Sequence, residues 1–432
     1  MVKFDGGQTV DKKLKVPVDL SNSNLKSVLE VPLLTSLLCN FLSITDRSKL
    51  FQAYPLDSIF RETVSKHLIV SLPAFSGQEF QIATRAIQLY GPPKVSFHPS
   101  LTPVQLPVVN NILKYYADRV PNLGEDRNEI RSTRLKKLDL TGVLINTTTA
   151  KILQERFIIK ELLLGETKPN FDKAFKMQKL IDLTVINNNN FLAYSLLDQA
   201  FESLETLTII NCKRILLDSV REVLINKKNF IKFTKIVLRD CVTAEGDMYL
   251  LNFLETVFSE LHNVSHFIFK FTVPPVNRTT EFFDLQLQSN SQISVLDLSN
   301  NTWLYKKIST VLLHTPCLKY LDLSGIVIEE NLDFEPLNSL EVLKIDYFLN
   351  CTQSLKTICP QKFKQLIVAN KLGKNNRKFK AIRLDELERL IVVGERKTLE
   401  FNSCLIREPD WLRRMKNNGK VEIVQADKLC KT

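Results

Sequence analysis

The sequence of 432 residues lacks the motifs and residues that most often build catalytic and cofactor sites. It has only 12 glycines, and none of them forms a P-loop, a GxGxxG fingerprint or a GxSxG elbow. Of its five histidines, His262 and His266 have the i, i+4 spacing of helical metal ligands, but they flank an apolar pattern typical of a strand. We therefore expect no catalytic residue, no cofactor and no metal.

Long apolar runs and paired cysteines are missing as well. No stretch approaches the uninterrupted apolar length of a membrane span, and the first residues contain no apolar core of a secretory signal. The eight cysteines include no CxxC pair and no terminal clusters of the kind that cap extracellular repeat proteins with disulfides. With a hydrophobic content of 44%, the chain is expected to fold and to stay soluble in the cytoplasm or nucleus.

One apolar pattern recurs eleven times between Leu135 and Val392. Each frame has an apolar residue, two variable residues, an apolar residue, one variable residue and a last apolar residue. Their central residues lie 21 to 31 residues apart and are Leu138, Leu162, Leu183, Leu207, Ile236, Phe267, Leu296, Leu321, Leu343, Leu366 and Leu390. Because side chains alternate along a strand, the closely spaced apolar residues of each frame would point into a shared core.

A small polar residue follows several of these frames, at Asn188, Cys212, Cys241 and Asn301. Such a side chain can bond backbone groups where the strand turns away. The frames and these positions together resemble an irregular leucine-rich repeat. The resemblance implies an α/β leucine-rich-repeat solenoid over residues 131–432, with a parallel concave sheet, a helical convex side and a C-terminal cap. The alternative is an ordinary parallel α/β sheet with chance matches.

The variable residues inside the frames would line the concave face, where repeat proteins bind their partners. Three aspartates recur there in LDL strands, either as solvated acidic residues or as contacts to a basic partner. The polar and aromatic candidates for binding a target protein are Asp139, Arg239, Lys270, Asp297, Tyr320, Asp322, Lys344 and Arg389.

The segment before the repeats has a different pattern. Residues 1–30 are polar and form an expected flexible lead-in, whereas residues 31–70 carry apolar residues at the spacing of three amphipathic helices, with Leu68 in the last. Residues 71–130 form a connecting segment in which PPKVSFHP and LPVVNNILKYYADRV predict a degenerate first strand and helix.

Residues 31–50 resemble an F-box, whose pattern has a proline, paired leucines, a Phe-Leu pair, an aspartate and a leucine. The residues that match this pattern, together with the neighbouring Leu37, are expected to bind an adaptor. They are Pro32, Leu33, Leu34, Leu37, Leu38, Phe41, Leu42, Asp46 and Leu50. The same stretch, with Cys39 and the following YPLDSIFRETVSKHL, is also similar to the BC-box of leucine-rich-repeat receptors that bind elongin C. Either resemblance implies a substrate receptor of a cullin-RING ubiquitin ligase, with a Skp-type adaptor or elongin C as partner.

Two other interpretations stay open. Residues 31–70 can instead be a helical cap that seals the first repeat, which would leave a protein-interaction scaffold without a ligase link. The charge of +11 is also uneven, because residues 362–432 hold 18 Lys and Arg against 9 Asp and Glu. The densest part carries Lys371, Lys374, Arg377, Lys378, Lys380 and Arg383, and such a patch either binds nucleic acid or anionic lipid, binds an acidic protein, or is a solvated surface.

Overall fold

The structure is a computed structural model, and its described residues cover most of the middle of the chain and short parts of the C-terminal quarter. They are residues 67–71, 77–98, 106–119, 135–167, 177, 179–188, 203–212, 217–227, 233–241, 247–271, 287, 292–304, 307–328, 337, 339–345, 347–348, 365–369, 389–394, 417–419 and 421–425.

The described strands form one 14-stranded sheet in which every neighbouring pair is parallel. Each strand pairs with the one before it and the next one in that sheet, so the sheet grows in chain order. Its strands are β1 (His67–Ser71), β2 (Lys94–His98), β3 (Lys137–Leu140), β4 (Glu161–Leu164), β5 (Asp182–Ile186), β6 (Thr206–Ile210), β7 (Lys235–Cys241), β8 (His266–Phe271), β9 (Val295–Asp297), β10 (Tyr320–Asp322), β12 (Val342–Ile345), β14 (Gln365–Ala369), β15 (Arg389–Gly394) and β16 (Val421–Gln425). A separate pair, β11 (Val327–Ile328) and β13 (Tyr347–Phe348), is also parallel.

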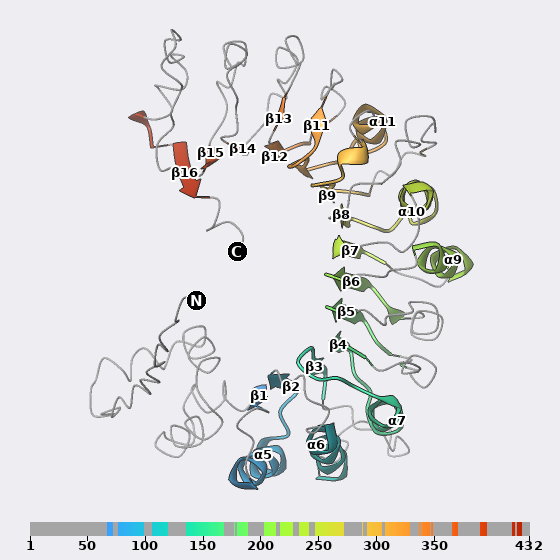
Figure 1. The fold of residues 1–432 in the computed structure, drawn as a ribbon, viewed down its shortest axis with the longest axis vertical. Helices are drawn as coiled ribbons and strands as arrows, with labels where there is room; N and C mark the ends of the chain where they lie inside the picture. Colours follow the sequence, from blue (N-terminus) through green and yellow to red (C-terminus); the bar gives the residue numbers. More distant parts are fainter. Residues whose placement is uncertain are drawn as a thin grey trace, which may run out of the picture.

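Helices connect several of these strands and lie on the outer side of the curved sheet, as Figure 1 shows. They are α5 (Gly77–Tyr90), α6 (Leu106–Arg119), α7 (Thr147–Arg156), α9 (Leu217–Lys227), α10 (Asp247–Glu260), the short α11 (Ile308–Leu313) and the single 3₁₀ turn Thr302–Leu304. Because parallel strands need long crossover connections, helices naturally cover the sheet face that the connections cross. The predicted α/β class with a parallel sheet is confirmed. The two segments predicted to form a degenerate first strand and helix contain β2 and α6, but β2 is the second strand of the sheet because β1 precedes it.

The central residues of all eleven frames lie in one continuous register. Leu138 pairs with Leu162, Leu162 with Leu183, and the series continues through every later central residue to Leu366 and Leu390. A slip of one residue in any strand would turn its apolar residues to the opposite face. The frames therefore define the register as well as the position of the strands.

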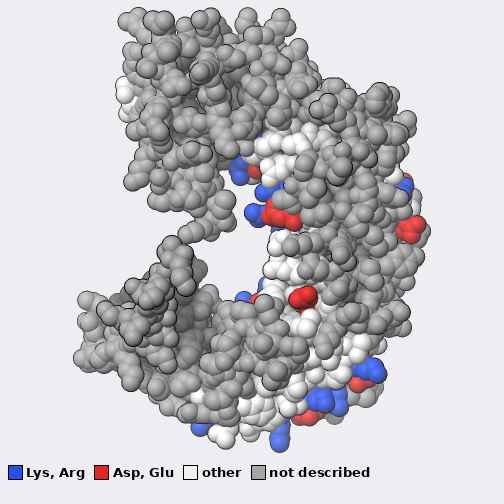
Figure 2. Space-filling model, viewed as in Figure 1, with Lys and Arg blue, Asp and Glu red and all other residues white. Residues whose placement is uncertain are grey.

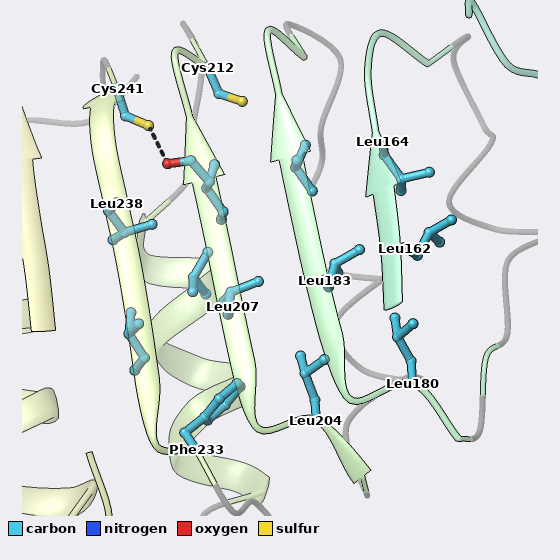
Figure 3. Packing of buried hydrophobic residues seen from close by; sticks show 14 of the residues in the cluster. Leu162, Leu164, Leu180, Leu183, Leu204, Leu207, Cys212, Phe233, Leu238 and Cys241 are labelled. Carbon is cyan, nitrogen blue, oxygen red and sulfur yellow. Dashed lines mark hydrogen bonds between the residues drawn. The ribbon is translucent and has the colours of Figure 1, made fainter. Parts of the chain in front are cut away.

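The core lies between the sheet and the outer helices. The frame residues from Leu135 to Leu323 are all at most 1% exposed. Figure 3 shows some of them stacked strand over strand, with Leu183 beside Leu162 and Leu207 beside Leu183. Burying each such side chain contributes about 1.5–3 kcal/mol, and each strand depends on its neighbours for that burial.

The polar residues that follow the strands bond the backbone at the turns, as predicted. The Asn188 amide donates to the Gly165 carbonyl at 3.0 Å, and the Cys241 thiol donates to the Ile209 carbonyl at 3.4 Å (Figure 3). Burial raises the pKa of Cys212 to about 11 and that of Cys241 to about 12, which keeps both thiols protonated as donors. An Asn or Asp residue with a positive φ, between 51° and 64°, directly precedes each of the positions Asn188, Cys212, Cys241 and Asn301. This backbone conformation turns the chain out of the sheet.

Two elements differ from the sequence-based expectation. Residues 67–71 form strand β1, so Leu68 does not belong to a helix. Leu68 and Val70 are both buried, with period-two alternation in HLIVS, and pairing with β2 outweighs the helical spacing. At the other end, β16 adds a strand after the last frame. The sheet also crosses residue 130 without a break, because β2 pairs with β3.

Candidate functional site

The candidate site is the inner face of the sheet, made of the strand side chains that point away from the core. In β3, β4, β5 and β6 partly exposed residues alternate with buried ones, so every second side chain lies on this face. Parallel register then places residues from different strands side by side, about 4.8 Å apart. Figure 2 shows charged side chains on the inner side of the arc in two groups, with uncharged surface between them.

The first group, which we call the β7–β12 charged cluster, consists of Arg239, Asp240, Lys270, Asp297, Tyr320, Asp322 and Lys344. At its β12 end the Lys344 ammonium lies 3.4 Å from the Asp322 carboxylate and 5.4 Å from the centre of the Tyr320 ring. Asp322 is 7% exposed, so this ion pair is shielded from water. Tyr320 precedes Asp322 by two residues on β10, and Lys344 is the residue paired with Asp322 on the neighbouring strand β12.

Asp240 lies at the β7 end of this cluster. Its carboxylate lies 3.5 Å from the Lys270 ammonium and 3.3 Å from the Arg239 guanidinium. The strand register shifts between Arg239 and Cys241, and Asp240 takes a φ of 52° there. The bulge turns Asp240 toward Lys270 on β8, which a regular strand would not do.

Asp297 and Asp322 are direct neighbours on β9 and β10. Burial and the nearby Asp322 charge raise the pKa of Asp297, while hydrogen bonds from Ser299 and the more distant Lys270 charge oppose this. In the same cluster, burial and the Asp322 charge raise the pKa of Tyr320. Burial lowers the pKa of Lys344 more than any other single effect changes it. The hydrogen bonds to Tyr320 and Asp322 and the charges of these groups together outweigh burial, so the pKa of Lys344 is raised.

The second group, the β2–β5 charged cluster, consists of Lys94, Lys137, Asp139, Glu161 and Asp182. The Lys137 ammonium and the Glu161 carboxylate form an ion pair at 2.6 Å. Burial and the charge of Lys137 lower the pKa of Lys94, and burial is the main cause of a raised pKa at Asp182. In the Lys137–Glu161 ion pair both side chains are at least about a third exposed, so the ion pair contributes little to stability.

The uncharged strip runs across β4 to β8, so it shares β4 and β5 with the β2–β5 charged cluster and β7 and β8 with the β7–β12 charged cluster. Its side chains are aliphatic or hydroxyl-bearing, and they are Leu163, Thr184, Ile186, Thr208, Ile210, Val237 and Ile268. All are partly exposed except Val237, which is 5% exposed. A surface of this kind can bury the apolar side chains of another polypeptide.

The three LDL aspartates have a structural role that neither sequence interpretation included. Asp139 accepts a hydrogen bond from the backbone amide two residues on, at 3.0 Å, and Asp297 and Asp322 do the same at 2.9 and 3.0 Å. One carboxylate oxygen of each thus closes a turn at the end of its strand. The other oxygen of Asp322 accepts a hydrogen bond from the Tyr320 hydroxyl at 3.5 Å and lies 3.4 Å from the Lys344 ammonium.

Of the eight residues predicted to bind a target, six lie in the β7–β12 charged cluster. Asp139 lies in the β2–β5 charged cluster, and Arg389 is placed only by its strand, β15, in register with Gln365. Sequence reasoning missed Asp240, Lys94, Lys137, Glu161 and Asp182. Apart from Asp240, these residues stand at the same outward strand position, one residue before the central apolar residue, which could have identified them.

The predicted adaptor-binding residues from Pro32 to Leu50 lie outside the described residues, as does the basic stretch from Lys371 to Arg383. Within the described residues, no group of three or more His, Cys, Asp or Glu side chains is placed to hold a metal ion. His266 begins β8, while His262 lies in the preceding turn, so the two do not share a helix face. None of the described helices combines the length and the hydropathy that a membrane crossing requires.

Comparison with known proteins assigns no family to this chain: no family model matches the sequence, and no curated protein matches it.

Proposed function

We propose that the chain is a leucine-rich-repeat protein that binds a target protein on the inner face of its sheet without catalysing a reaction. The observation that carries the proposal is the unbroken register of eleven apolar frames, with an inner face of two charged clusters around an uncharged strip. A stacked-repeat architecture explains that register, because each repeat contacts only its neighbours. Charged groups beside an apolar centre are the usual composition of a specific protein interface.

We further propose that residues 31–50 bind the adaptor of a cullin-RING ligase, either a Skp-type protein or elongin C, in the cytoplasm or nucleus. The support is the resemblance of Pro32, the paired leucines and the Phe41-Leu42 pair to an F-box or BC-box. In this proposal the inner face holds a target that the ligase then ubiquitylates. A repeat scaffold without a ligase link is the competing outcome.

The target-binding half is tested with Thr208→Arg, which places a long charged side chain in the uncharged strip. Thr208 is partly exposed, so we expect folding to survive and the proteins captured by the full-length chain to be lost. Thr148→Arg is the matched control, because Thr148 is exposed on α7 at the outer side. If both variants capture the same proteins as the wild type, the inner face is not the binding surface.

The ligase half is tested by co-purifying the full-length chain with a Skp-type adaptor, elongin C and cullins. A chain with Leu37→Ala and Phe41→Ala should then lose the adaptor, by about 1–4 kcal/mol of binding free energy, and keep its melting temperature. If the two residues only cap the repeats, the same variant should lose several kcal/mol of stability. A large loss of stability, with no adaptor bound by the wild-type chain, would exclude the ligase link.

A further inference from the structure

Two side chains of opposite charge border the uncharged strip without an ion-pair partner. Asp182 on β5 is partly buried, and one of its oxygens accepts a hydrogen bond from the Thr184 hydroxyl at 3.3 Å. Its second oxygen meets no donor among the described residues, because the neighbouring Lys137 pairs with Glu161. Lys235 on β7 is exposed, and the described residues place no carboxylate within ion-pair distance of it. Each of the two side chains can therefore accept an opposite charge from a partner.

The register fixes how far apart these two charges lie. Asp182 pairs with Thr206, and Thr206 pairs with Lys235, so the two charged residues are two strands apart, or about 10 Å. Both stand one residue before the central apolar residue of their strand, which places them along one border of the strip. The strip itself begins two residues further along the strands, with Thr184 and Thr208. A ligand on the strip thus passes an acidic and then a basic side chain on the same border.

The spacing of the strands matches a helix better than an extended segment. One turn of an α-helix advances about 5.4 Å, close to the strand spacing of about 4.8 Å, so a helix across the sheet places about one turn over each strand. Its residues i and i+7 share a face at about 10.5 Å, near the separation of the two charges. An extended segment repeats a face every 6.7 Å or so, which matches neither one nor two strand spacings. The strip from β4 to β8 covers four spacings, or about 19 Å, the length of roughly 13 helical residues.

We propose that the target segment is an amphipathic helix lying across β4 to β8, with a Lys or Arg against Asp182 and an Asp or Glu seven residues away against Lys235. This inference rests on the proposed function, since it names the chemistry of the partner that the inner face binds. The apolar stripe of the helix covers the uncharged strip, as in other complexes where a helix lies in a groove. A helix with the two charges exchanged would bring like charges together, which gives the surface its specificity.

A polypeptide helix fits this surface better than nucleic acid or an anionic membrane does. Glu161 and Asp182 line the border on β4 and β5 and would repel phosphate groups. The aliphatic side chains of the strip, among them Leu163, Ile210 and Ile268, can bury apolar groups of a partner. An amphipathic helix offers both an apolar stripe and charges of both signs beside it.

The test uses the full-length chain and a phage-displayed library of random 20-residue peptides, followed by synthesis of the selected peptides. We expect them to carry apolar residues at helical spacing, with a basic and an acidic residue seven positions apart, and to gain helical circular dichroism on binding. Lys235→Glu should weaken binding by about fivefold or more, and exchanging the acidic residue of the peptide for Lys should restore binding to this variant. With Asp182→Asn, the peptide should bind equally well when its basic residue is replaced by Gln.

Both variants should fold, because Lys235 is exposed and an asparagine at 182 keeps the oxygen that accepts from Thr184. Lys319→Glu is the matched control, since Lys319 is exposed next to β10 and lies outside the strip, and it should bind the peptides as the wild type does. Peptides that lose binding with Thr208→Arg but bind without helix, or without rescue by the charge exchange, would overturn the helix contact and leave the inner-face function standing. Peptides insensitive to Thr208→Arg would overturn both, and so would a library that yields no binder.

Discussion

Replacing Asn301 by Ala should destabilise the protein strongly, because this side chain bonds three buried groups at the end of β9. Its amide nitrogen donates to the Phe269 carbonyl and, at 2.8 Å, to the Leu298 carbonyl, and its oxygen accepts from the Trp303 indole at 3.2 Å. Asn301 itself is 0% exposed. Each buried group left without a partner costs about 1–3 kcal/mol. Since the Leu298 carbonyl keeps its bond from the backbone amide of residue 301, at 3.3 Å, and Trp303 can partly rearrange, we expect a total loss of about 2–4 kcal/mol.

Asn301→Cys is the matched variant, because the chain itself uses cysteine at this turn position. The Cys241 thiol donates to the Ile209 carbonyl of the preceding strand, as Asn301 donates to Phe269. A cysteine at 301 should keep that one bond, so the expected loss is smaller, about 1–2 kcal/mol. The free energy of unfolding is measured by urea denaturation with circular dichroism. An Ala variant within about 0.5 kcal/mol of the wild type, or a Cys variant less stable than the Ala variant, would refute the reasoning.

Two further predictions, which use three substitutions, test single features of the turns and of the inner face. Because burial and Asp322 raise the folded-state pKa of Asp297, the folded protein binds more protons than the unfolded chain just above the usual aspartate range, and stability falls as pH rises through that window. Asp297→Asn should therefore raise the melting temperature at pH 7, with the gain shrinking toward about pH 4, and a gain that grows on acidification would contradict this. Gly325→Ala would place a Cβ 2.2 Å from the Asn300 side-chain oxygen at a φ of 78°, whereas Gly419→Ala, at a φ of 67°, meets nothing within 4 Å. We expect about 1 kcal/mol of lost stability from backbone strain in the second variant and at least about 1 kcal/mol more in the first, and equal losses in urea denaturation would rule out the steric contribution.

The sequence alone was sufficient to predict the strands that carry the eleven apolar frames and their place in one parallel sheet. The apolar frames mark which side chains enter the core, and the period of two along a strand leaves a single register that buries them all. The polar turn positions were predictable for a similar reason, because Asn188 and Asn301 follow the frames at a constant distance and bond backbone groups that every such turn leaves free. These features depend on short-range patterns that repeat along the chain.

The tertiary structure alone decided which charged groups meet. Asp240 reaches Lys270 only because a bulge turns it toward the next strand; the turn position at Cys241 is visible in the sequence, but the charged group that Asp240 meets there is not. Strand β1 was not predicted from the sequence either, because the short apolar alternation in HLIVS forms a strand only by pairing with β2. Asp297 and Asp322 lie 25 positions apart in the sequence and become neighbours through the register of β9 and β10. Ion pairs and pKa shifts depend on distances between strands, and those distances exist only once the strands have stacked.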